Sequence, residues 1–156
     1  MKLATFERGG APQTGIVAGD SIVATGLPGS MIDLIAGWET LHGQIESAVA
    51  TGERYRLSSV RLLAPVQRPG KIFAIGLNYA DHIAESRMER PKHQVWFTKA
   101  VTSINGPFDP ILIAKSGPLV DYEVELVAVI GKRGRNIART DAPAHVFGYC
   151  VGNDVT

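Results

Sequence analysis

The segment DYEVELVAVI, residues 121–130, is the stretch of sequence that decides the fold. It belongs to an expected strand over 120–130, the longest in the chain, whose apolar residues continue as far as Ile130. Side chains alternate between the two faces of a strand, so Glu123 and Glu125 point the same way and Val124, between them, points the other way. The two glutamates therefore share one face, with Cα atoms about 7 Å apart at a rise of roughly 3.3 Å per residue.

This pair of glutamates has two interpretations, and the residues alone leave both open. Mg²⁺ prefers oxygen ligands, so two carboxylates on one face can converge on such an ion. The plainer interpretation is a solvated strand face, but this face continues into Val127 and Val129, where like charges are costly unless they are paired or metal-bound. Asp154, near the end of the last expected strand, supplies a third carboxylate if the two strands are adjacent. Otherwise Asp154 is an ordinary turn aspartate.

A second candidate group lies upstream of the glutamates. His82 and Glu85 are spaced i and i+3 on an expected helix, so their side chains are neighbours. A carboxylate beside an imidazole fixes its tautomer and suits it to act as a base near neutral pH, although a surface ion pair is the commoner cause of this spacing. Lys99 ends the apolar run Trp96-Phe97-Thr98 and is either a contact for a substrate carboxylate or a lysine that extends to solvent.

The order of the elements predicts two units in an α+β chain. Residues 1–65 form a small β-rich lobe, with expected strands at 2–6, 14–17 and 21–25 and expected helices at 31–36 and 38–50. Two prolines and a glycine mark a boundary at 63–70, so the second domain covers 70–156. Its expected strands lie at 71–75, 95–99, 111–114, 120–130 and 148–155. Its expected helices run from Asn78 through about Met88 and from Thr140 through about Val146.

The composition excludes several classes of partner. The 156 residues carry 16 basic and 15 acidic side chains, mixed along the chain, so neither a nucleic-acid footprint nor an electrostatic membrane anchor is expected. No stretch approaches the roughly 20 apolar residues of a membrane span. The start, MKLATFERGG, reaches Arg8 and two glycines before a signal-peptide run can form, and Cys150 is the single cysteine. We therefore expect a soluble protein of the cytoplasm.

Four segments together resemble the fumarylacetoacetate hydrolase family. They are GLNYADHIAE (76–85), WFTK (96–99), VDYEVELVAVIGK (120–132) and GYCVGNDVT (148–156), in the family's order and with its gaps. Glu125 and Asp154 are 29 positions apart (154 − 125), and His82 and Lys99 are 17 apart (99 − 82), which is also the family's pattern. The resemblance runs from about Lys71 to the end of the chain and implies a mixed β-sheet roll, of which about half would be missing. Residues 1–65 resemble the family's variable N-terminal lobe only in general style.

The resemblance also implies a site and a chemistry. It assigns Mg²⁺ or Mn²⁺ to three carboxylates: Glu123, Glu125 and Asp154. It implies that His82, oriented by Glu85, activates water or moves a proton from a helix that orders over the substrate, and that Lys99 assists substrate binding. A 2-oxo acid chelates such an ion through its carboxylate and keto oxygens. The expected reaction is hydrolysis of a C–C bond in an acylpyruvate-like 2-oxo acid, with decarboxylation or isomerisation of 2-oxo dicarboxylates as the alternative. The resemblance also implies a homodimer.

Two departures from the family pattern qualify these expectations. After Lys99 the run Ala100-Val101-Thr102-Ser103 replaces the usual prolines and serine, which leaves Thr102 as the stand-in for a substrate contact. The family's sequence continues well beyond its third carboxylate, so we expect these 156 residues alone to be a fragment with little or no activity. A non-catalytic binding or dimerisation module is the alternative from a different class.

Overall fold

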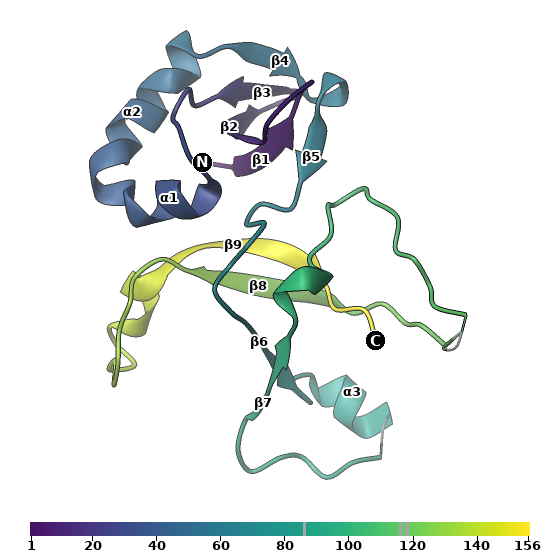
Figure 1. The fold of residues 1–156 in the computed structure, drawn as a ribbon. Coiled ribbons are helices and arrows are strands. Elements are labelled where there is room, and N and C mark those ends of the chain that lie inside the picture. The colour runs from purple at the N-terminus through teal and green to yellow at the C-terminus, as the bar shows by residue number, and fades with distance from the viewer. Residues whose placement is uncertain (86, 116, 118) are drawn as a thin grey trace.

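The structure of the protein is a computed structural model, which describes residues 1–85, 87–115, 117 and 119–156, apart from the side chain of His82. The architecture is α+β, as predicted, and rich in strands. Figure 1 shows the N-terminal lobe above a long curved strand pair, with a second strand pair and a short helix below it. None of the helices in these described ranges has the length and apolar character that a membrane crossing requires.

The N-terminal lobe is a five-stranded antiparallel sheet in the order β4-β3-β2-β1-β5, flanked by two helices (Figure 1). The strands are β1 (Leu3–Glu7), β2 (Gln13–Ala18), β3 (Ser21–Ala24), β4 (Arg54–Arg56) and β5 (Arg61–Leu63), and the helices are α1 (Met31–Ala36) and α2 (Trp38–Thr51). A 3₁₀ turn, η1 (Leu57–Ser59), joins β4 to β5. β4 and β5 were not predicted from the sequence.

The start of α1 has a local cause in the sequence. The Ser30 hydroxyl accepts a hydrogen bond from the Asp33 N–H (3.4 Å), and the Asp33 carboxylate accepts one from the Ser30 N–H (2.7 Å). This capping box satisfies backbone donors that the first turn of a helix leaves free. The same contacts lower the pKa of Asp33, with the backbone hydrogen bond from Ser30 as the largest cause. Gly37 then separates α1 from α2, as the sequence predicted.

The hydrophobic core lies within this lobe. All the buried apolar side chains of the described residues belong to positions 6–63, and Phe6, Ile22, Val23 and Ile45 are fully buried. Gly15, at the centre of β2, has no room for a side chain, because neighbouring core side chains fill the space that its Cβ would occupy. A Cβ placed on Gly15 would lie 2.7 Å from Ile22 Cγ1 and 2.8 Å from Phe6 Cε1.

Gly15→Ala is therefore expected to destabilise the chain by about 1–3 kcal/mol, because an added methyl overpacks a filled core. Gly43→Ala is the matched control, since Gly43 is exposed inside α2 and a Cβ there meets nothing within 4 Å. That substitution should stabilise by about 0.5–1 kcal/mol through helix propensity. Urea unfolding curves of the two variants should shift in opposite directions, and a shared direction would contradict the packing described for β2.

The second part of the chain consists of two antiparallel strand pairs. β6 (Ile72–Gly76) pairs with β7 (Val95–Lys99), and α3 (Ala80–Glu85) lies between them in sequence. β8 (Val124–Ile130) pairs with β9 (Val146–Asn153), and two 3₁₀ turns, η2 (Val101–Ser103) and η3 (Ala142–His145), complete this part. Unlike the lobe, this part leaves large apolar side chains exposed, for example Leu126 at 70% and Val151 at 77%.

The two parts meet where α2 approaches the start of β9. Val129 pairs with Gly148, whereas Ile130 pairs with Val146, so Phe147 is the extra residue of a β-bulge. The Phe147 ring packs edge-on against Trp38 of α2, with ring centroids 5.0 Å apart and an angle of 86° between the planes. A surface ion pair between Lys132 and Glu39 (2.8 Å) lies at the same junction.

Several predicted elements of the second part were wrong in extent or type. Residues 111–114 are not a strand; they follow Pro110 and pair with no strand among the described residues. The expected helix from Asn78 through Met88 is shorter, because Arg87 adopts a left-handed φ of 54° that no helix continues. The expected helix from Thr140 is the 3₁₀ turn η3 instead, and the Thr140 hydroxyl donates to Asp141 Oδ1 (3.2 Å) rather than capping it.

Candidate metal centre

The pairing of β8 with β9 continues past the ends of both strands. The Asp154 N–H donates to the Glu123 carbonyl (2.9 Å), and Asp121 and Thr156 exchange two backbone hydrogen bonds of 2.8 and 3.2 Å. These bonds keep the register in which Val124 pairs with Asn153. Glu123 therefore precedes β8 rather than lying within it, but it faces Asp154 directly across the pair.

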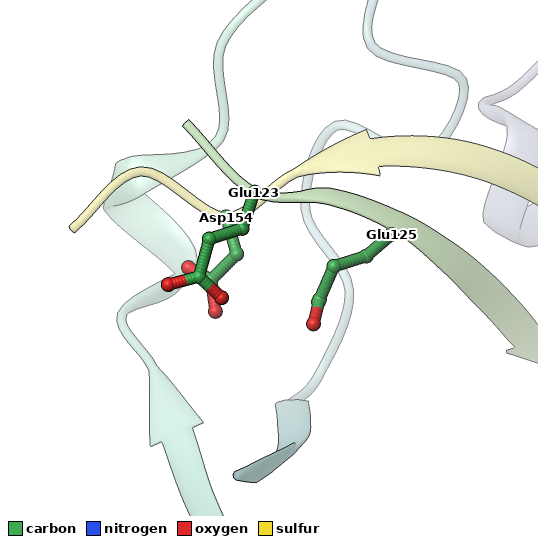
Figure 2. Close-up of side chains that lie close together, drawn as sticks. All are labelled: Glu123, Glu125 and Asp154. Carbon is green, nitrogen blue, oxygen red and sulfur yellow. The ribbon is translucent and has the colours of Figure 1, made fainter. Parts of the chain in front are cut away.

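This register brings the three predicted carboxylates together. Cross-strand partners lie on the same face, and Glu125 is two positions from Glu123, so all three side chains project to one side (Figure 2). One oxygen of Glu123, one of Glu125 and one of Asp154 all lie within 4.8 Å of one another. Two oxygens bound to one Mg²⁺ at 2.0–2.1 Å are at most about 4.2 Å apart. Small side-chain rotations therefore suffice to close this set around an ion.

Asp154 is the most buried member of the cluster, and one of its oxygens is paired with a lysine. Its exposed fraction is 9%, against partial exposure for the two glutamates. Asp154 Oδ1 forms an ion pair with Lys99, 2.5 Å from its ammonium nitrogen, and no further hydrogen bond reaches this oxygen from the described residues. The Lys99 ammonium also donates to the Val155 carbonyl at 3.2 Å. A buried carboxylate oxygen with a lone pair to spare suits a metal ligand.

The charges of the cluster act on Glu125 most clearly. Burial raises the pKa of Glu125 above its ordinary value of 4.5, and the carboxylates of Asp154 and then Glu123 raise it further, while Lys99 lowers it. A cation bound among the three carboxylates would favour the ionised form of Glu125, because it neutralises the charges of the neighbouring carboxylates. The buried lone pair, the hard oxygen donors and the mutual repulsion all fit a divalent ion such as Mg²⁺ or Mn²⁺.

Two polar residues that the sequence did not single out support Glu123. Its N–H donates to the Asn153 side-chain oxygen (3.1 Å), and its carboxylate oxygen Oε1 accepts from the Thr156 hydroxyl (3.2 Å). The signal for both residues was their position beside Asp154 in the run Gly152-Asn153-Asp154-Val155-Thr156. Sequence reasoning missed them because their contacts depend on the register.

The structure does not bring the predicted acid–base helix to these carboxylates. In the β6–β7 pair, Ile72 faces Lys99 and Gly76 faces Val95, and α3 follows Gly76. The helix therefore leaves the hairpin about 13 Å from Lys99, four residues along at roughly 3.3 Å each (Figure 1). Glu85 is exposed on α3, and the predicted side chain of His82 lies outside the described residues. The predicted stand-in Thr102 is exposed in η2, just after Lys99.

Two surface hollows lie away from the carboxylates. A hollow of ≈ 530 Å³ lies on the N-terminal lobe between α2 and the β2–β3 strands, lined mainly by small or uncharged residues together with Glu53. A smaller one of ≈ 280 Å³ lies beside α3 and includes Arg90, Lys92 and His93. Neither hollow is lined by Glu123, Glu125 or Asp154. The candidate metal ligands therefore lie outside both hollows.

The sequence of this chain matches known families over both of its parts. Residues 71–156 match the family described as fumarylacetoacetate (FAA) hydrolase C-terminal, and residues 1–65 match the one described as Rv2993c-like, N-terminal. The chain belongs to the fumarylacetoacetate hydrolase family. The family resemblance predicted from the four sequence segments is thereby confirmed.

Solved structures of the fumarylacetoacetate hydrolase family confirm the predicted fold. A maleylpyruvate hydrolase from Sphingobium sp. SYK-6, solved in complex with manganese (II) ion and pyruvate, superposes with a TM-score of 0.84 at 36% identity, covering 100% of this chain and 59% of that one. A fumarylacetoacetate hydrolase from Exiguobacterium antarcticum superposes with a TM-score of 0.82 at 35% identity, covering 100% and 56%.

Curated relatives of this fumarylacetoacetate hydrolase family member include tautomerases. A mitochondrial oxaloacetate tautomerase of Bos taurus is 42% identical over 131 residues, which is 83% of this chain and 42% of that protein. The chain thus spans about two fifths of that curated relative. Members of the family are enzymes, both hydrolases and tautomerases.

Proposed function

We propose that this chain supplies the metal-binding part of an enzyme that acts on a small 2-oxo acid, with C–C bond hydrolysis in an acylpyruvate-like substrate as its reaction. The observation that carries the proposal is the convergence of Glu123, Glu125 and Asp154 on one face of the β8–β9 pair. The maleylpyruvate hydrolase whose fold matches the whole chain was solved with manganese and pyruvate, and this supports both the ion and the class of substrate.

Each residue of the proposed site has a role that follows from its position. Glu123, Glu125 and Asp154 would hold the ion and leave the outward side of the cluster for substrate. When bound, Mg²⁺ or Mn²⁺ supplies Lewis-acid polarisation of the carboxylate and keto oxygens of a 2-oxo acid. Lys99, at the end of β7, provides a positive charge beside that position for an anionic substrate.

The proton-transfer step is assigned to His82, oriented by Glu85. Both residues belong to α3, which lies at the far end of the β6–β7 pair from Lys99. To act on a substrate at the cluster, α3 must move toward it. Leu77 and Arg87, on either side of this helix, both have left-handed φ angles, 51° and 54°. Such angles are unfavourable for these residue types and are found where a backbone is held in a particular conformation.

A second candidate reaction is keto–enol tautomerisation of a 2-oxo dicarboxylate. The oxaloacetate tautomerase of Bos taurus, 42% identical over 83% of this chain, favours it. Both reactions pass through removal or delivery of a proton next to a 2-oxo group, so the same carboxylates and the same base serve either one. We further propose a homodimer in the cytoplasm, without nucleic-acid or membrane partners.

The metal site is tested by titrating the chain with Mn²⁺ in a calorimeter. We expect one ion per chain, and we expect Glu123→Ala to weaken binding more than about 100-fold, beyond the 10–100-fold that loss of a residue supporting a metal ligand costs. Glu39→Ala is the matched control, because Glu39 is exposed on α2 and pairs with Lys132 instead. A wild-type chain that binds no Mn²⁺, or a Glu123→Ala variant that binds it as tightly, would remove the basis of the proposal.

The reaction is identified by assaying the chain with Mg²⁺ against acylpyruvates and oxaloacetate. Hydrolysis cleaves an acylpyruvate and releases pyruvate, whereas tautomerisation converts the enol of oxaloacetate to its keto form, which removes the ultraviolet absorbance of the enol without releasing pyruvate. Pyruvate release with no effect on the oxaloacetate enol favours the hydrolase, and the reverse favours the tautomerase.

A further inference from the structure

Lys99 reaches the acidic cluster from a different strand pair. It ends β7, where it faces Ile72 of β6, while the three carboxylates belong to the β8–β9 pair. Its ammonium nitrogen lies 2.5 Å from Asp154 Oδ1 and 3.2 Å from the Val155 carbonyl oxygen. The Lys99 side chain is 29% exposed and that of Asp154 only 8%. This contact is therefore partly shielded from water, unlike the surface pair of Lys132 and Glu39, at 58% and 78%.

The position of this ammonium group has an electrostatic cause. Three carboxylates with ligand oxygens within 4.8 Å of one another repel each other strongly when no cation is near. The Lys99 charge offsets part of that repulsion, and it acts on Glu125 in the direction opposite to the two neighbouring carboxylates. Lys99 thus places a positive charge where the three carboxylates need one.

The same position conflicts with a bound divalent ion. Asp154 is one of the proposed ligands, and its Oδ1 is the oxygen that the ammonium approaches. An ion about 2.1 Å from the same carboxylate would place two positive groups within a few ångströms of each other in a partly buried site. Repulsion between them favours movement of the long, flexible lysine side chain, which is already 29% exposed, toward solvent.

We propose that Lys99 is a resident counter-cation: it holds the acidic cluster together in the metal-free protein and is displaced from Asp154 when the divalent ion binds. This inference rests on the proposed metal site. It adds a competition between lysine and metal at one carboxylate, and it sets the order of events at the site. The ion enters first, and the ammonium group that it releases is then free to meet the carboxylate of an anionic substrate.

The proposal predicts the sign of a change in metal affinity. Lys99→Met removes the competing charge, so Mn²⁺ should bind about tenfold more tightly at low salt, since the lost repulsion acts over a few ångströms in a partly shielded site. The metal-free variant should melt at a lower temperature than wild type, and saturating Mn²⁺ should remove the difference. Lys99→Arg keeps the charge and should bind Mn²⁺ with nearly wild-type affinity. Lys132→Met is the matched control, because it breaks a lysine–carboxylate pair far from the cluster.

The outcomes separate this inference from the proposed function. If the wild-type chain binds no Mn²⁺, the metal site itself fails. If wild type binds Mn²⁺ but Lys99→Met binds it equally or more weakly, the metal site stands and the competition is overturned. Weaker binding in that variant would mean that Lys99 only positions Asp154.

Labelling of the wild-type protein tests the displacement without a variant. An amine-reactive ester modifies exposed lysines, and peptide mass spectrometry compares the yield at Lys99 with that at Lys132 in the same sample. We expect Mn²⁺ to raise the yield at Lys99 severalfold and to leave Lys132 unchanged. An unchanged or lower yield at Lys99 in the presence of bound Mn²⁺ would overturn the proposal.

Discussion

Glu125→Gln is expected to weaken Mn²⁺ binding more than about 100-fold, beyond the 10–100-fold that loss of a residue supporting a metal ligand costs. At neutral pH the same substitution is expected to stabilise the metal-free protein. The ion loses an anionic ligand, but the empty cluster loses a charge that burial, Asp154 and Glu123 all disfavour. Calorimetric titration measures the first effect, and thermal unfolding in a chelating buffer measures the second. Weaker binding together with higher stability of the metal-free protein is typical of a functional site that is strained without its ligand.

The pH dependence of Glu125→Gln has a definite sign. A carboxyl whose pKa is raised on folding destabilises the folded state in full above that raised pKa, and the penalty is lost as the pH falls through it. The stability difference between variant and wild type should therefore be largest at neutral pH and should vanish below the ordinary value of 4.5. Glu46→Gln, at an exposed position of α2, should change neither metal binding nor the pH profile. A destabilised Glu125→Gln variant at neutral pH would contradict the repulsion described in the cluster.

Phe147→Ala is expected to lower the free energy of unfolding by about 3 kcal/mol, the lower end of the range for truncating a packed phenylalanine, because this ring is only half-buried. The ring packs against Trp38 and joins the cluster of buried side chains that includes Met31, Leu34 and Ile45. Its loss removes the aromatic contact between the N-terminal lobe and the β8–β9 pair. Urea unfolding followed by tryptophan fluorescence reports on the change directly, because Trp38 is the contact partner.

Phe108→Ala is the matched control for Phe147→Ala. The Phe108 side chain is 84% exposed, so its removal should change stability by less than about 0.5 kcal/mol. If the two variants were equally stable, the contact with Trp38 would contribute little, and the two parts of the chain would be joined mainly by their linker. If Phe147→Ala produced two separate unfolding transitions, the aromatic contact would be what couples the parts into one cooperative unit.

Local sequence pattern predicted the elements that bury a face or have a cap of their own. The boundaries of α1 were predictable because Met31 and Leu34 face the core and Gly37 follows the helix. The strand predicted at 111–114 shows the limit of this reasoning. Its residues are as apolar as those of a true strand, but a strand exists only where a neighbouring backbone is available to pair with it, and local pattern carries no such information.

The acidic cluster was predictable only in part, because local pattern indicates which side chains share a face of one strand but not which strands pair. The shared face of Glu123 and Glu125 follows from strand alternation alone, and the structure confirms that both side chains project to the same side (Figure 2). That Asp154 faces them depends on the β8–β9 register, which spacing along the chain leaves open. The approach of Lys99 to Asp154 could not be foreseen, since it joins two separate strand pairs.

The bulge at Phe147 separates the geometry of the carboxylates from the length of the loop that joins β8 to β9. From Val129 and Gly148 to Asp121 and Thr156 the two segments keep one constant offset, and the extra residue at the other end absorbs the mismatch. A slip of one residue would turn Asp154 to the opposite face, so this offset alone decides whether a chelate can form. Residues 133–140, beyond the bulge, are exposed and take no part in this register. That loop tip is where a fluorophore or an affinity handle can be attached while ion capture proceeds undisturbed.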